Sequence, residues 1–196
     1  MSTLEWSRPS LSNRPKLKNH SSVVLDGKIY IFGGYDGHSN NNELLVLSLE
    51  SSTLSQCMKY TGSPPDPRNG HTATIVGRYT GSRYIIACIT FTRRMYVIGG
   101  WLGGGTIAAN DVHVLDFDTM HWSARTSNTR APPCNMHTAE YIPSLNRILV
   151  FRGGDGQQYL NDLQAYDVAC DVWSKVVCRG RAPSPRANHA SAVLHK

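Results

Sequence analysis

The chain has 196 residues, among them 17 glycines and 10 prolines, and a formal net charge of +6. This length is enough for one domain with a sizeable core, and frequent turn-forming residues favour short strands over long helices. The basic residues are dispersed without a run of five like charges, so the sequence predicts no nucleic-acid partner.

The first sixteen residues hold Trp6 and a connector rich in Pro, Ser and Arg, and they predict a remnant of an outer strand. A four-stranded unit follows, in which an Asp-Gly hairpin turn joins the first two strands. The second strand is apolar at successive positions and ends in a glycine pair, which predicts burial on both of its faces. The four strands of this unit are expected over residues 20–25, 28–32, 42–47 and 54–58.

A basic residue, an apolar run and a glycine pair recur at residues 94–100 and 147–154, which indicates a repeat architecture. Each recurrence follows a strand that begins with His and precedes an Asn-Asp strand and then a strand with Trp. We therefore expect a remnant, three complete units and the first strand of a further unit. Their predicted ranges are 1–16, 17–64, 65–130, 131–180 and 181–196.

These units resemble the Kelch repeat, because each has four strands, an apolar run ending in Gly-Gly, a later Tyr/Leu-Asp pair and a Trp position beyond it. The phrase Pro-x-x-Arg-x-x-His at residues 65–71 and 183–189 is similar to the Kelch subclass of the Rab9 effector, host cell factor and leucine-zipper-like regulator proteins. The resemblance implies an all-β fold. It implies a partial β-propeller of three four-stranded antiparallel blades with flanking single strands, each blade having its His-led strand innermost.

Three positions depart from the repeat pattern. Leu54 replaces Trp in the first unit, while Leu17 and Cys134 replace Arg at the heads of the first and third units. These departures predict weaker bracing of those two blades. Because three blades cannot close a ring, we also expect two exposed apolar faces that permit self-association, and a fragment of a longer Kelch protein is an alternative.

The second unit is longer than its neighbours by about fifteen residues, because the motif histidines are spaced by 51, 66 and 52 residues. Deleting residues 79–93 restores the match to the first unit. Two explanations stay open: a genuine hairpin insertion, which loops tolerate, and translation of a short unspliced intron.

The sequence predicts no catalytic residue, metal or cofactor. Four motif histidines (His20, His71, His137 and His189) are expected near the propeller axis, where a hydrogen bond to the neighbouring blade explains them better than a metal does. A metal- or redox-dependent propeller enzyme is the alternative from another class. Five scattered cysteines without C-x-x-C, and no signal peptide or long apolar run, predict a cytoplasmic protein without a membrane partner, with the nucleus as the alternative location.

By the resemblance, the loops after each second strand and before each first strand gather on one face. The expected function is a scaffold or adaptor that binds a protein or peptide there, with arginines meeting an acidic partner. The alternative role for each arginine is a salt bridge between blades. The candidate partner-binding residues are Tyr35, Asp36, His38, Arg68, Asn69, Trp101, Asp155, Gln157, Tyr159, Arg186 and Asn188.

Overall fold

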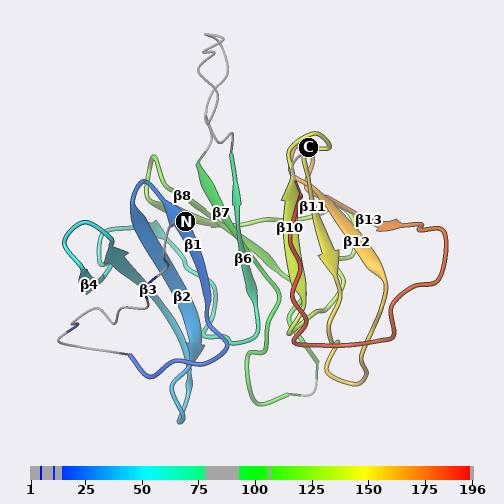
Figure 1. The fold of residues 1–196 in the computed structure, drawn as a ribbon, viewed down its shortest axis with the longest axis horizontal. Coiled ribbons are helices and arrows are strands. Elements are labelled where there is room, and N and C mark those ends of the chain that lie inside the picture. Colours follow the sequence, from blue (N-terminus) through cyan, green and yellow to red (C-terminus); the bar gives the residue numbers. More distant parts are fainter. Residues whose placement is uncertain (1–4, 6–10, 12–14, 78–92, 106, 195–196) are drawn as a thin grey trace, which may run out of the picture.

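The computed structural model describes residues 5, 11, 15–77, 93–105 and 107–194 (Figure 1). The predicted strand remnant at Trp6, and all of the predicted insertion except Arg93, lie outside the described residues. Every regular element within the described residues is a β-strand. No described segment forms a helix with the length and apolar character needed to cross a membrane.

The strands form three separate sheets, which we call blades 1, 2 and 3, side by side in Figure 1. Blade 1 contains β1 (Ser21–Leu25), β2 (Lys28–Tyr35), β3 (Asn40–Ser48) and β4 (Thr53–Gln56). Blade 2 contains β6 (Thr72–Val76), β7 (Arg94–Ile98), β8 (Val112–Asp116) and β9 (His121–Ala124). Blade 3 contains β10 (Thr138–Ile142), β11 (Arg147–Phe151), β12 (Leu163–Asp167) and β13 (Val172–Val176).

Within each blade, successive strands pair antiparallel in chain order, which confirms the predicted fold class. One pairing was not foreseen: β5 (Thr61–Gly62), in the connection from blade 1, adds a short parallel strand to β9. The outer edge of blade 2 is therefore closed by the preceding connection. Thr61 strengthens this contact, because its Oγ1 lies 2.8 Å from Nδ1 of His121.

The core consists of two apolar clusters, one in each interface between blades. Strand β7 contributes to both: Met95 and Val97 pack toward blade 1, whereas Tyr96 and Ile98 pack toward blade 3. All four side chains are at most 1% exposed. This alternation is what a strand covered on both faces requires, and it explains why the run is apolar at successive positions.

The same prediction is wrong for β2. Tyr30 and Phe32 pack toward blade 2, but Ile29 and Ile31 on the other face stay half-exposed, since no described blade stacks against them. The aromatic residues of the outer strands pack toward the preceding blade, as shown by Trp122, whose ring centroid lies 5.3 Å from that of Phe32.

A ladder of backbone hydrogen bonds joins the blades near their inner strands. The N–H of Gly70 donates to the carbonyl of Asn19 at 2.9 Å, that of Met136 to Gly70 at 2.7 Å, and that of Asn188 to Met136 at 3.0 Å. All four residues have a positive φ and directly precede a motif histidine. The repeat thus needs a left-handed residue at this position, which Gly and Asn tolerate best.

Candidate functional site

The loops after β2, β7 and β11 lie on one face of the molecule, at the bottom of Figure 1, together with the segments that lead into β1, β6 and β10. We call this the loop face. The hairpin turns that join the first and second strands of blades 1 and 3 lie at the opposite end. The sequence-predicted candidate residues come from segments of the loop face, except Arg186 and Asn188, which belong to the segment after β13.

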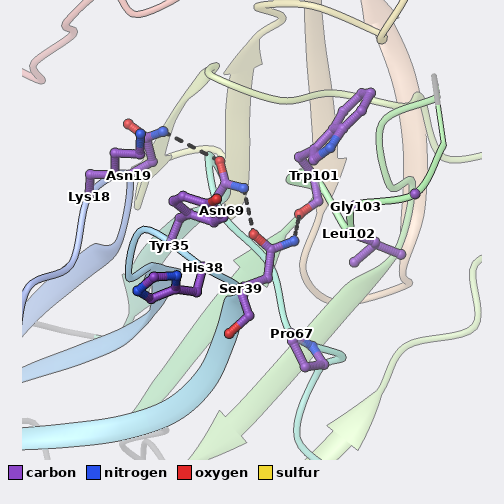
Figure 2. A pocket seen from close by; sticks show the side chains of 12 residues that line it. Lys18, Asn19, Tyr35, His38, Ser39, Pro67, Asn69, Trp101, Leu102 and Gly103 are labelled. Atoms are coloured by element: carbon purple, nitrogen blue, oxygen red, sulfur yellow. Dashed lines mark hydrogen bonds between the residues drawn. The ribbon is translucent and has the colours of Figure 1, made fainter.

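A cleft of about 680 Å³ opens on the loop face between blades 1 and 2 (Figure 2). This volume is within the usual range of ligand sites in proteins. Its lining consists of Lys18, Asn19, Tyr35, His38, Ser39, Asn40, Pro67, Asn69, Trp101, Leu102, Gly103 and Gly104.

Three asparagine side chains cross this cleft in a directed chain of hydrogen bonds (Figure 2). The Nδ2 of Asn19 donates to Oδ1 of Asn69 at 3.4 Å, and the Nδ2 of Asn69 donates to Oδ1 of Asn40 at 2.7 Å. The Nδ2 of Asn40 then donates to the carbonyl of Trp101 at 3.0 Å. Each amide nitrogen carries two hydrogens, so each of the three keeps one N–H for a ligand.

Tyr35 and Trp101 occupy the same place in successive repeats and flank this amide chain. Tyr35 exchanges backbone hydrogen bonds with Lys18 at 2.9 and 3.0 Å, and Trp101 exchanges them with Asn69 at 2.7 and 3.1 Å. The Nζ of Lys18 also lies 5.0 Å from the centroid of the Tyr35 ring, within reach of a cation–π contact. The cleft therefore combines two aromatic walls, amide donors and one ammonium group.

Asp36 and Asp155 serve the loops themselves. In each case the Oδ1 accepts hydrogen bonds, at 2.7 to 2.9 Å, from the backbone N–H groups two and three residues further on. These hydrogen bonds hold the pKa of both carboxyl groups below the usual value. Both carboxylates therefore close tight turns, and neither lines the cleft.

Arg68 belongs to the scaffold and is not available to an acidic peptide, because its side chain is 0% exposed. Its Nη1 and Nη2 donate to the two oxygens of Asp111 at 2.6 and 2.8 Å, and Nη1 also reaches the carbonyl of Gly99 at 2.9 Å. Although partial burial opposes the effect, Arg68 and His113 hold the pKa of Asp111 well below its usual range. The backbone N–H of Arg68 donates to Asn41 of blade 1, so this residue connects two blades.

The remaining candidates lie away from the cleft. Arg186 is exposed, and its Nε and Nη2 donate to the carbonyl and Oγ of Ser184 at 3.0 Å. Tyr159, on blade 3, is 66% exposed. The structure thus gathers Tyr35, His38, Asn69 and Trp101 in one cleft but not Asp155, Gln157, Tyr159, Arg186 or Asn188.

Sequence reasoning missed several lining residues, above all Lys18, Asn19 and Asn40. A usable signal existed for Lys18, because it stands two residues before a motif histidine, as Asn69 does. For Asn40, the signal was weaker, since one polar residue in a polar loop does not show which neighbour it meets.

Three of the motif histidines, His71, His137 and His189, make hydrogen bonds toward the preceding blade. The Nε2 of His71 donates to the carbonyl of Phe32 at 3.1 Å, and the Nε2 of His137 lies 2.9 Å from Oγ1 of Thr72. Burial lowers the pKa of both imidazoles to about 3. Within the described residues, no group of three or more His, Cys, Asp or Glu side chains is placed to hold a metal ion.

Comparison with known proteins supports the repeat assignment. The family description "KLHDC2/KLHL20/DRC7 Kelch-repeats domain" matches residues 1–87 and 85–196. Acyl-CoA-binding domain-containing protein 4 of Arabidopsis thaliana is 28% identical over 176 residues, which cover 89% of this chain and 24% of that protein.

Two further relatives extend this comparison. Kelch domain-containing protein 1 of Mus musculus is 26% identical over 197 residues, covering 92% of this chain and 47% of that protein. The leucine-zipper-like transcriptional regulator 1 homolog of Drosophila melanogaster is 27% identical over 246 residues, covering 96% of this chain and 24% of that protein. The chain therefore spans between about a quarter and about half of the length of these relatives.

Proposed function

Because this chain belongs to the Kelch-repeat family, whose domains generally mediate protein–protein interaction, we propose that it is a scaffold that binds a partner in the cleft between blades 1 and 2. The observation that carries the proposal is the chain of asparagine amides between Tyr35 and Trp101. Tyrosine and tryptophan side chains are frequent energetic centres of protein interfaces. The proposal is one of binding without catalysis.

The partner is a peptide segment that offers hydrogen-bond acceptors. The three amides present spare N–H groups, which suit peptide carbonyls and side-chain carboxylates. Lys18 adds a positive charge, whereas none of the described residues that line the cleft carries a carboxylate. An acidic, extended segment therefore matches the lining better than a basic one, because its carboxylates meet donors and a cation without meeting an acid.

A random peptide library displayed on phage tests this proposal. The protein and its variants Trp101→Ala and Asn69→Ala would be panned in parallel, and binding of the enriched peptides would be measured by calorimetry. We expect enrichment of Asp- and Glu-containing peptides on the unaltered protein and at least about tenfold weaker binding to either variant, the effect of losing about 1.4 kcal/mol.

The control variant is Leu145→Ala. Leu145 is 55% exposed in the turn between β10 and β11, at the opposite end of the blade from the loop face. It should bind the peptides as the unaltered protein does. Enrichment of basic peptides, or binding that survives Trp101→Ala and Asn69→Ala, would contradict the proposal.

Self-association through the outward faces of blades 1 and 3 is a second part of the proposal. The strand register places Val24, Ile29, Ile31, Leu45 and Leu47 on the face of blade 1 that points away from blade 2. Leu149, Phe151, Leu163 and Val176 share the corresponding face of blade 3. Contiguous apolar faces of this kind favour association, and sedimentation of the 196-residue chain over a range of concentrations tests it.

A further inference from the structure

Two segments of the chain are near copies of each other and occupy equivalent places at its two ends. Residues 186–194 read RANHASAVL and residues 17–25 read LKNHSSVVL, so five of the nine aligned residues are identical. Residues 17–25 contain β1, which pairs with β2. Residues 186–194 lie beside blade 3, and no second strand follows them among the described residues.

The segment of residues 186–194 is already positioned as the start of a further blade. The N–H of Asn188 continues the backbone ladder to Met136 at 3.0 Å, and the N–H of Arg186 donates to the carbonyl of Leu160 at 3.2 Å. The Nε2 of His189 lies 3.1 Å from Oγ1 of Thr138, as His137 does with Thr72 one blade earlier. These contacts repeat the junction between blades 2 and 3.

The two ends of the molecule also carry the counterparts of the ion pair between Arg68 and Asp111 in blade 2. Arg186 repeats the local geometry of Arg68, because each Nε donates to the carbonyl two residues earlier at 3.0 Å. Asp111, the acid of the pair, directly precedes Val112, the partner of Ile98 in the sheet. By the same register, Glu43 directly precedes Leu44, the partner of Phe32, in blade 1, where Leu17 replaces the arginine. Both Arg186 and Glu43 are exposed, and neither forms an ion pair with a described residue.

We propose that two copies of this chain exchange these segments. Residues 186–194 of one copy replace residues 17–25 on β2 of the other, and Arg186 pairs with Glu43 of the partner subunit. The outward faces of blades 1 and 3 then cover each other at both junctions, and the three described blades of each copy together close into a ring with two-fold symmetry. This inference rests on the proposed self-association and specifies its register and its ion pair.

The exchange has a consequence for the cleft. In the aligned segments Ala187 corresponds to Lys18, and Asn188 corresponds to Asn19. The ring therefore keeps one amide of the chain that crosses the cleft but loses the ammonium group above Tyr35. Assembly and the binding of acidic peptides are thus coupled, with acidic peptides favouring the single chain.

Charge reversal tests the ion pair. Sedimentation equilibrium of the 196-residue chain would give the dimer dissociation constant for Arg186→Glu, for Glu43→Arg and for the double variant. We expect each single variant to weaken the dimer by about tenfold, and the double variant to recover most of the loss. Arg181→Glu, in the same exposed segment but outside the motif, should have no comparable effect, and circular dichroism should show the same strand content in all variants.

Engineered disulfides test the register. In β1, Val24 lies opposite Ile29, so the exchange places Val193 opposite Ile29 of the partner subunit. The double variant Val193→Cys/Ile29→Cys should form a covalent dimer on mild oxidation, and Ser191→Cys/Ile29→Cys, offset by two residues, should not.

The two tests separate the possible failures. A chain that stays a monomer at every concentration overturns both the exchange and the self-association. A dimer whose affinity ignores the charge reversals, or that cross-links equally at both engineered pairs, overturns the exchange and leaves self-association standing.

Discussion

In blades 2 and 3, the acid before the third strand pairs with an arginine, but this arginine comes from a different position of the repeat in each blade. In blade 2, the acid before the third strand, Asp111, pairs with Arg68 from the head of the unit. In blade 3, the corresponding acid is Asp162, and its partner is Arg152, whose Nε lies 2.9 and 3.1 Å from the two carboxylate oxygens. Cys134 occupies the head position there, and Arg152 supplies the guanidinium that the head of the third unit lacks.

The arginine of blade 3 can come from a different position because Arg152 stands where blade 2 has Gly99. Gly99 has a φ of +59°, and a Cβ there would lie 2.3 Å from the carbonyl oxygen of Cys134. Arg152 stays outside the left-handed region, so it can carry a side chain. The comparison teaches that the guanidinium that pairs with this acid can come from more than one position of the repeat.

The largest expected effect comes from removing the arginine of blade 2. Arg68→Leu leaves the carbonyl of Gly99 without its buried donor and leaves Asp111 with His113 but without its guanidinium, so we expect the free energy of unfolding to fall by about 3 kcal/mol. Arg152→Leu should cost only about 1–2 kcal/mol, because the Arg152 side chain is 17% exposed whereas that of Arg68 is 0% exposed, so water replaces some of the lost interaction. Urea unfolding followed by tryptophan fluorescence measures both values. Equal losses would show that burial does not distinguish the two blades.

A second prediction concerns Gly99, whose place in blade 3 is taken by Arg152. Gly99→Ala forces a Cβ against the backbone of Cys134 and places alanine at a positive φ, so we expect a loss of about 2 kcal/mol in unfolding free energy. Gly105→Ala is the matched control, because Gly105 has open space around its Cβ position and no positive φ, and it should change stability little. The same urea experiment compares them, and a tolerated Gly99→Ala would contradict the close approach of blade 3.

The sequence predicted the antiparallel strands because the periodicity of hydrophobic residues and the turn residues report local structure directly. It could not place Arg152, because aligning the third unit by its glycine pair shifts the register by one residue. The structure instead pairs Gly154 with Asn135 as it pairs Trp101 with Asn69.

The candidate site was predictable in part for a related reason. Tyr35 and Trp101 follow the glycine pair in a recognisable phrase, and the sequence identified both. The hydrogen bonds from Asn19 to Asn69 and from Asn69 to Asn40 depend on how two blades meet, which no single repeat encodes. For Arg68, the sequence left partner binding and a salt bridge both open, because a motif shows the residue type but not its exposure.

Blades 2 and 3 both bury their motif histidine, and the dependence of stability on pH tests this burial. Burial lowers the pKa of His71 and His137 from the ordinary 6.5 to about 3, so the unfolded chain takes up protons below pH 6.5 that the folded chain does not. The free energy of unfolding should therefore fall as the pH drops from 6.5 toward 3. The low pKa of Asp111 adds a loss only near and below its ordinary 3.8.

His137→Gln isolates one of these two contributions. At pH 5.5, one unit below the ordinary value, we expect the variant to lose about 1 kcal/mol less than the unaltered protein does, relative to pH 7. Urea unfolding at the two pH values measures the difference. An unchanged acid loss would mean that His137 takes up a proton in the folded state.

The smallest expected effect lies at the residue before the motif histidine, where blade 2 has Gly70 and blade 3 has Met136. Both have a positive φ, of 65° and 49°, but an unbranched side chain such as that of methionine is strained there, whereas asparagine tolerates it. Met136→Asn should therefore raise the free energy of unfolding by about 0.5–1 kcal/mol and keep the N–H of residue 136 bonded to Gly70. The opposing term is packing, because the sulfur of Met136 lies 3.0 Å from where a Cβ of Gly70 would be. A loss of stability in Met136→Asn would show that this contact outweighs backbone strain, and Met136→Leu, which keeps the bulk and the strain, should then remain close to the unaltered protein.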